Sequence, residues 1–218
     1  MLAQPGGRVY NEKNADLGVM TVGVEYELKY KASKGAQQAV REAFEEPWQR
    51  IAMETTYYDT ADGALSARHY TLRRRMENGR SVCTLKTPLE GYGRGEWDTE
   101  CGSIEKAIPI LCKLGGPEDL TVLTAEGVEA VCGARFTRWA CTVDLGTAVI
   151  ELALDEGVLF GGGKEMPLCE IEVELKSGSR EAATLFSGHM AGRYGLVPEG
   201  KSKFKRALDL RRGNKNGA

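Results

Sequence analysis

Charged and apolar residues alternate along several short segments of the chain. In residues 24–30, Glu25, Glu27 and Lys29 alternate with apolar residues. Because successive side chains of a strand point to opposite faces, the three charged residues share one face and the apolar residues share the other. The apolar face requires a hydrophobic core. The charged face therefore either contacts solvent or lines a polar cavity.

The same alternation recurs in later segments. The polar positions with this period are Glu170, Glu172 and Glu174; Arg73 and Arg75; Thr84 and Lys86; and Arg94, Glu96, Asp98 and Glu100. Any one of these segments is more often a solvated strand face than part of a site. Independent exposed faces, however, have no reason to separate acidic from basic residues. This separation predicts a sheet whose second face has a function.

The hydrophobic period changes between strand and helix along the chain. Strands are predicted at about 21–31, 54–59, 70–77, 80–87, 94–101, 136–144, 147–156 and 167–176. Helices are predicted at about 34–50, 103–115, 117–132 and 180–194, and a short one after Ser202. Ser33 and Ser179 are candidate N-caps, and Asn78-Gly79 predicts a two-residue hairpin turn. About eight antiparallel strands with polar faces inward predict a mainly β α+β fold, a closed barrel with a polar interior and helices packed on the outside.

We expect a single domain over residues 21–212. Residues 1–20 lack any hydrophobic period, so we expect a disordered leader there, and we expect a disordered tail over 213–218.

Composition narrows the class of protein. The chain has 218 residues and a formal net charge of -2, so no overall basic field predicts nucleic-acid binding. No apolar run approaches the roughly 20 residues needed to span a bilayer, and the N-terminus has no hydrophobic signal core. The six cysteines form no CxxC pair, so we expect reduced thiols without a zinc site. These features predict a cytoplasmic protein without a membrane partner.

The segregated charges predict a particular chemistry. Glutamate triplets supply the oxygen ligands that Mg²⁺ or Mn²⁺ prefers, while Arg and Lys suit phosphate oxygens. Together they suit a complex of a divalent metal with a polyphosphate. The sequence contains no GxxxxGK[ST] motif, so ordinary P-loop nucleotide binding is not expected.

Six segments in order resemble one known family. They are Val24-Glu25-Tyr26-Glu27-Leu28-Lys29, Tyr57-Tyr58-Asp59-Thr60, Leu72-Arg73-Arg74-Arg75, Thr84-Leu85-Lys86, Glu170-Ile171-Glu172-Val173-Glu174-Leu175 and Ser202-Lys203. The first resembles the ExExK signature of CYTH domains, the triphosphate tunnel metalloenzymes. The resemblance covers about residues 21–210 and is strongest to bacterial inorganic triphosphatases. It implies an eight-stranded antiparallel tunnel.

The resemblance also implies roles for individual residues. The implied metal ligands are Glu25, Glu27, Asp155, Glu170 and Glu172. The implied phosphate-binding residues are Lys29, Arg73, Arg75, Lys86, Arg138 and Lys203. Glu27 or Glu174 is expected to orient the attacking water, and Lys29 is expected to assist catalysis.

The implied activity is metal-dependent hydrolysis of inorganic triphosphate with Mg²⁺ or Mn²⁺, by a monomer or a homodimer. The alternatives within the family are thiamine triphosphatase, nucleoside triphosphatase and class IV adenylate cyclase. A non-enzymatic alternative is a module that binds polyphosphate or RNA. Such a module would not need so many carboxylates among its cations, because each one repels phosphate unless a metal intervenes.

Overall fold

One antiparallel sheet organises the molecule. The computed structural model describes residues 26–88 and 94–213. The strands are β1 (Glu27–Lys31), β2 (Gln49–Asp59), β3 (Thr71–Glu77), β4 (Arg80–Pro88), β5 (Arg94–Glu100), β6 (Glu129–Asp144), β7 (Ala148–Gly161), β8 (Lys164–Gly178) and β9 (Val197–Pro198). The helices are α1 (Lys34–Ala43), α2 (Ala64–Ala67), α3 (Ile104–Lys113), α4 (Asp119–Leu123), α5 (Arg180–Tyr194) and α6 (Lys203–Arg212).

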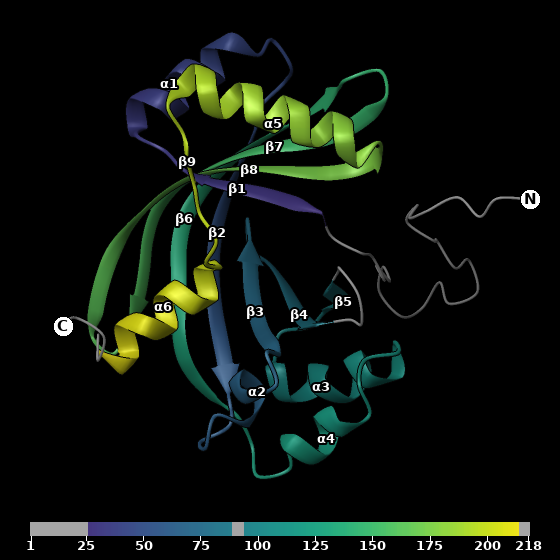
Figure 1. Ribbon diagram of the computed structural model, residues 1–218. Coiled ribbons are helices and arrows are strands. Elements are labelled where there is room, and N and C mark those ends of the chain that lie inside the picture. The colour runs from purple at the N-terminus through teal and green to yellow at the C-terminus, as the bar shows by residue number, and fades with distance from the viewer. Residues whose placement is uncertain (1–25, 89–93, 214–218) are drawn as a thin grey trace, which may run out of the picture.

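The strands lie in the order β5-β4-β3-β2-β6-β7-β8-β1-β9. Every neighbouring pair is antiparallel. The sheet curves strongly, so that it has a concave and a convex face (Figure 1). The mainly β α+β class is therefore confirmed.

Two details of the predicted barrel are wrong. The described residues form nine strands rather than eight, because Val197–Pro198 adds a short strand beside Tyr30 and Lys31. A two-residue strand has no alternation to detect, and proline is compatible with its position at the sheet edge. In addition, no hydrogen-bonded pairing among the described residues joins β5 to β1 or β9, so the sheet is not closed.

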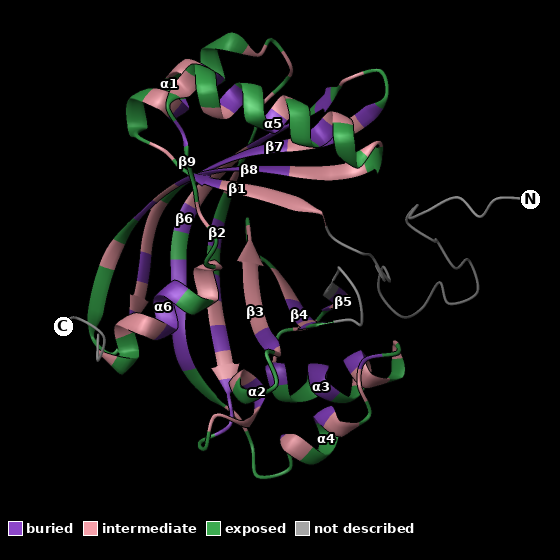
Figure 2. Cartoon of the chain, viewed as in Figure 1, coloured by how far each residue is buried: buried purple, intermediate pink, exposed green. Residues whose placement is uncertain are grey.

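Helices cover the convex face in two places. Helices α1 and α5 pack over β1, β7 and β8, where Val40, Ile171 and Val173 belong to one buried cluster. Helices α3 and α4 cover the strands at the other end, where Leu72, Leu85 and Leu111 belong to a second cluster. The outward surfaces of α1 and α5 are exposed in Figure 2, with buried residues on the strands beneath them.

Helix α6 does not lie outside the barrel, as the sequence predicted for every helix. It packs on the concave face in front of β6 (Figure 1). There Ala207 and Leu208 join Met53, Phe136 and Leu168 in a third buried cluster. The apolar residues of α6 require a covering surface, and this end of the concave face supplies one. The helix thereby brings its first residues next to the polar part of the same face.

Local expectations about turns and caps are confirmed. Asn78 and Gly79 have φ values of 49° and 89°, as the hairpin between β3 and β4 requires. Ser33, Ser179 and Ser202 each accept a hydrogen bond from a main-chain N–H in the first turn of the helix that follows.

Two predicted helices are too long. The helix predicted over 34–50 ends at Ala43, because Pro47 disfavours a helical conformation before it and β2 begins at Gln49. The helix predicted over 117–132 is wrong beyond Leu123. Thr124 is the C-cap of this helix, and a turn that leads to Gly127, with φ of 95°, connects it to β6, which begins at Glu129.

Candidate functional site

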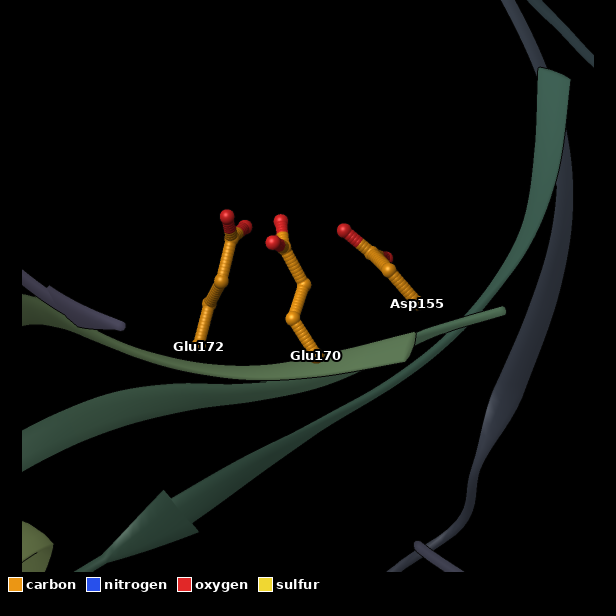
Figure 3. A group of neighbouring side chains, drawn as sticks. All are labelled: Asp155, Glu170 and Glu172. Carbon is orange, nitrogen blue, oxygen red and sulfur yellow. The ribbon is translucent and has the colours of Figure 1, made fainter. Parts of the chain in front are cut away.

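Three carboxylates form the floor of a polar site on the concave face. Asp155 lies on β7, and Glu170 and Glu172 lie on β8. Asp155 and Glu170 are directly opposite in the sheet register, so their side chains lie on the same face. The three side chains are buried, and one oxygen of each lies within 4.8 Å of the others. All three point to the same side of the strands (Figure 3). We call Asp155, Glu170 and Glu172 the acidic floor.

Lys203 contacts all three carboxylates of the acidic floor. Its Nζ lies 2.8 Å from Asp155 Oδ2 and 2.6 Å from Glu172 Oε1, and it also forms an ion pair with Glu170. Lys203 is the first residue of α6, directly after the N-cap Ser202. The cap therefore fixes the point from which this side chain reaches the floor.

Two arginines complete the neutralisation of the floor. Arg138 Nε and Nη2 donate to the two oxygens of Asp155 at 2.8 and 2.7 Å, and Nη2 also donates to Glu172. Arg206, one turn after Lys203 on α6, donates to Glu170. Three buried carboxylates thus face three cations, as burial of charge requires.

These ion pairs and the burial of the site shift the pKa values of Glu172, Lys203 and Glu170. Burial alone would raise the pKa of Glu172, but Lys203 and Arg138 outweigh burial and hold it well below its usual range. Burial likewise opposes the charged form of Lys203, yet Asp155, Glu172 and Glu170 raise its pKa. For Glu170 burial prevails, and its pKa lies above the ordinary value although Lys203 and Arg206 oppose the shift. Glu172 and Lys203 therefore stay charged at neutral pH.

A second carboxylate group lies beside the floor on β1, β7 and β8. Glu27 and Glu174 are opposite in register, as are Glu174 and Glu151. Lys29 lies 3.2 Å from Glu27 and faces Glu172 across the β1–β8 pair. Lys176 lies 2.7 Å from Glu174 and 3.6 Å from Glu151. These carboxylates are more exposed than those of the acidic floor, so water or a ligand can contact them.

Three predicted cations lie on the neighbouring strands β3 and β4. We call Arg73, Arg75 and Lys86 the basic wall. Arg73 Nη2 and Lys86 Nζ lie 3.5 and 3.2 Å from Glu96, and Arg75 pairs with Glu77. The Nε atom of Arg75 is buried and has no hydrogen-bond partner among the residues that the structure describes. A buried donor without a partner fits a site that receives an anionic ligand.

The pKa of Arg75 lies below the usual arginine value, mainly because the side chain is buried and also because the positive charge of Arg73 is nearby. The positive charge of Arg138 contributes to the same shift, so the wall and the floor interact electrostatically. Tyr57 lies between the basic wall and the helix that carries Lys203. It pairs with Arg73 across β2 and β3, and its ring lies 5.0 Å from that of Phe204, the residue after Lys203.

The structure therefore brings most of the predicted site residues to one concave face. Glu25 is the exception, because it lies outside the described residues. Asp59, in one of the family-like motifs, is not in this group. Its carboxylate accepts hydrogen bonds from the main-chain N–H groups of Thr60, Leu65 and Ser66, and so fixes the turn that leads into α2.

Four further residues of the site were given no role from the sequence, although Glu96 lies in one of the alternating segments. Glu96, Lys176 and Arg206 pair with predicted site residues. Gln37 on α1 donates from the convex side to the main-chain oxygens of Asp155 and Glu170, both at 2.9 Å. Continued alternation after Glu174 could have indicated Lys176, whereas nothing in the sequence links α1 to these two carbonyl groups.

Among the helices that the structure describes, none combines the length and the apolar character that a membrane span requires.

Comparison with known proteins identifies the family. The profile of the CYTH domain matches residues 23–208. The chain is 33% identical over 135 residues to the inorganic triphosphatase of Haemophilus influenzae, an alignment that covers 60% of this chain and 38% of that protein. The chain thus matches well under half of the length of this relative.

Solved structures show the same fold at lower identity. A protein of Pyrococcus horikoshii OT3 has a TM-score of 0.58 and 24% identity, over 86% of this chain and 99% of that one. A Hippeastrum protein, a candidate adenylyl cyclase described as having a dominant triphosphatase activity, has a TM-score of 0.60 and 21% identity, over 86% and 96% of the two chains. With a profile match over most of its length, the chain belongs to the CYTH domain family.

Proposed function

We propose that this protein hydrolyses inorganic triphosphate to pyrophosphate and phosphate with a divalent metal, Mg²⁺ or Mn²⁺. The observation that carries the proposal is that one concave face holds a cluster of carboxylates and, on neighbouring strands, a group of cations. The acidic floor and the Glu27–Glu174 pair form the first, and the basic wall forms the second. The name of the Haemophilus influenzae relative supports the same activity.

The carboxylates fit a hard divalent cation. They offer oxygen donors from three adjacent strands, and those of the acidic floor lie within 4.8 Å of one another. Glu27 and Glu172 are the proposed principal ligands, with Glu25 preceding them on the chain and Asp155 and Glu170 completing the set. Polarisation of a phosphoryl group and partial neutralisation of its charge are the chemistry that such an ion supplies when bound.

The cations fit the phosphate chain. Arg73 and Arg75 offer planar, multiple donors to phosphoryl oxygens, and Lys86 acts as a point charge. Lys29, Arg138 and Lys203 lie on the floor side and are proposed to hold the phosphoryl groups nearest to the carboxylates. Stabilising the charge that spreads over the phosphoryl oxygens in the transition state is the main catalytic contribution of such groups.

Water is the proposed nucleophile. Glu27 and Glu174 are proposed to orient it, because both are partly exposed and lie beside the floor. Cys83, Cys132 and Cys141 are unsuited to this role, because burial raises the pKa of each thiol to about 12. Direct attack by water, without a covalent intermediate, is the simplest route.

Phosphate release from tripolyphosphate tests the proposal. The purified chain is incubated with tripolyphosphate and Mg²⁺ or Mn²⁺, and free phosphate is measured. We expect release by the wild type and a loss of about 10²-fold or more for Glu172→Gln, which removes one charge and keeps the side-chain shape. Equal release by the variant at saturating metal would show that Glu172 is not a metal ligand, and no release by either protein with either metal would overturn the proposal.

A further inference from the structure

Lys203 lies where three anionic oxygens converge. Its Nζ is 2.8 Å from Asp155 Oδ2 and 2.6 Å from Glu172 Oε1, and it pairs with Glu170 as well. Its side chain is only 12% exposed. Three carboxylate oxygens around one cation form the arrangement in which a hard metal ion is bound. The ammonium group therefore takes a position that suits such an ion.

The charges of the floor balance without any metal. Asp155, Glu170 and Glu172 carry three negative charges when ionised. Arg138, Lys203 and Arg206 contribute three positive charges at ion-pair distance. A divalent ion added to this buried group leaves uncompensated positive charge, which is costly in a low-dielectric region. Binding of the ion to these oxygens requires that one of the cations leave or that an anion arrive.

Lys203 is the cation best able to leave. Arg138 is held by two parallel hydrogen bonds to Asp155, and Arg206 lies on the second turn of α6. Lys203, by contrast, extends from the first residue of α6 on a flexible four-carbon stem. The adjacent Phe204 packs against Tyr57, which pairs with Arg73 of the basic wall, so the wall lies beside the start of the same helix.

We propose that Lys203 and a divalent metal ion compete for the oxygens of Asp155, Glu170 and Glu172, with Lys203 bound there in the ligand-free protein. The proposal rests on the proposed function in one respect: a triphosphate supplies the negative charge toward which the displaced ammonium turns. Metal and triphosphate then bind with positive cooperativity, because each relieves the charge imbalance that the other creates. Metal binding to the protein alone is correspondingly weak.

The dissociation constant for Mn²⁺ tests the competition directly. It is measured on the full chain by isothermal titration calorimetry, without any phosphate compound. Lys203→Met keeps the length of the stem and removes the charge. We expect it to bind Mn²⁺ about tenfold or more tightly than the wild type. Lys205→Met is the matched control, because Lys205 lies on the same helix but pairs with Asp209 at its exposed surface; it should leave the constant unchanged.

An unchanged or weaker Mn²⁺ affinity in folded Lys203→Met would overturn the proposal, and so would an equal gain in Lys205→Met. Should Lys203→Met fail to fold, the wild type provides a second measurement. The side-chain ammonium resonance of Lys203, assigned by its absence in Lys203→Arg, should move on titration with Mg²⁺. A fixed resonance at saturating Mg²⁺ would contradict the competition. Neither measurement needs turnover, so failure of the triphosphatase activity remains a separate result.

Discussion

Arg138 and Asp155 form a bidentate ion pair inside the sheet. Arg138 Nε donates to Asp155 Oδ1 at 2.8 Å, and Nη2 donates to Oδ2 at 2.7 Å. The two residues are directly opposite on β6 and β7, so the sheet register itself sets the pair. The family resemblance implies that Arg138 binds phosphate and that Asp155 binds metal, so these two roles meet in one ion pair. The site is organised before any ligand arrives.

Loss of this pair should destabilise the fold. Arg138→Ala leaves the fully buried Asp155 with Lys203 as its remaining cation, and we expect the free energy of unfolding to fall by about 3 kcal/mol or more. Arg135→Ala is the matched control on the same strand, since its pair with Glu165 is more than half exposed, and it should cost about 0–1 kcal/mol. Urea denaturation followed by circular dichroism measures both. Equal costs for the two variants would show that the Arg138 pair adds nothing to stability.

The basic wall should control catalytic efficiency. We expect Arg73→Ala, Arg75→Ala and Lys86→Ala each to lower kcat/KM for tripolyphosphate by about 10²-fold or more, because each removes a charge-assisted contact in a water-poor site. Arg74 lies between the two arginines but on the opposite face, where it donates to the main-chain oxygen of Gly102 at 3.0 Å. Arg74→Ala should change kcat/KM only a few-fold. If kcat/KM fell as much in Arg74→Ala as in the three wall variants, the basic wall would not be the phosphate-binding surface.

Turnover should depend on added divalent metal. A divalent cation bound by the carboxylates of this face is proposed to polarise the phosphoryl group and to neutralise part of its charge, so removal of metal with excess EDTA should abolish phosphate release. Restoring Mg²⁺ or Mn²⁺ should recover it. Glu27→Gln should need more metal for half-maximal activity than the wild type. Full turnover in excess EDTA would show that catalysis does not need a metal ion bound by these carboxylates.

Three of the six cysteines should resist alkylation in the folded protein. Burial raises the pKa of Cys83, Cys132 and Cys141 to about 12, so at pH 8 only about one thiol in 10⁴ is the reactive thiolate. Mass spectrometry after treatment with iodoacetamide should find these sites unmodified in buffer and modified in urea. Cys112, which is partly exposed, is the internal comparison. Modification of Cys83 in buffer at the same rate as Cys112 would show that strand β4 opens readily.

Much of the concave face could be predicted from sequence. The alternation of Glu170, Glu172 and Glu174 with apolar residues depends only on the two-residue period of a strand, which holds however strongly the sheet curves. The same period assigned Arg73 and Arg75 to one face. The capping serines and the Asn78-Gly79 turn were also predictable, because their chemistry is local.

The rest depends on contacts between distant segments. The amphipathic pattern of α6 shows that one of its sides is buried, but not which face of the sheet covers it, so the position of Arg206 beside Glu170 could not be foreseen. Among the described residues no hydrogen-bonded pairing joins the outer strands, and this is likewise a property of the assembled sheet. Gln37 reaches the site only because α1 packs on the strands that carry Asp155 and Glu170.

The rank of substrates tests the central proposal most directly. The cations of the site are spread over β1, β3, β4, β6 and α6, so they can bind more than two phosphoryl groups, and a diphosphate would leave several of them without a phosphoryl group to bind. The measurement is kcat/KM for tripolyphosphate, ATP and pyrophosphate under identical metal. We predict that kcat/KM is higher for tripolyphosphate than for ATP and that pyrophosphate is a poor substrate. A preference for ATP of about tenfold or more, or formation of cyclic AMP, would contradict the proposed function and favour a nucleotide substrate.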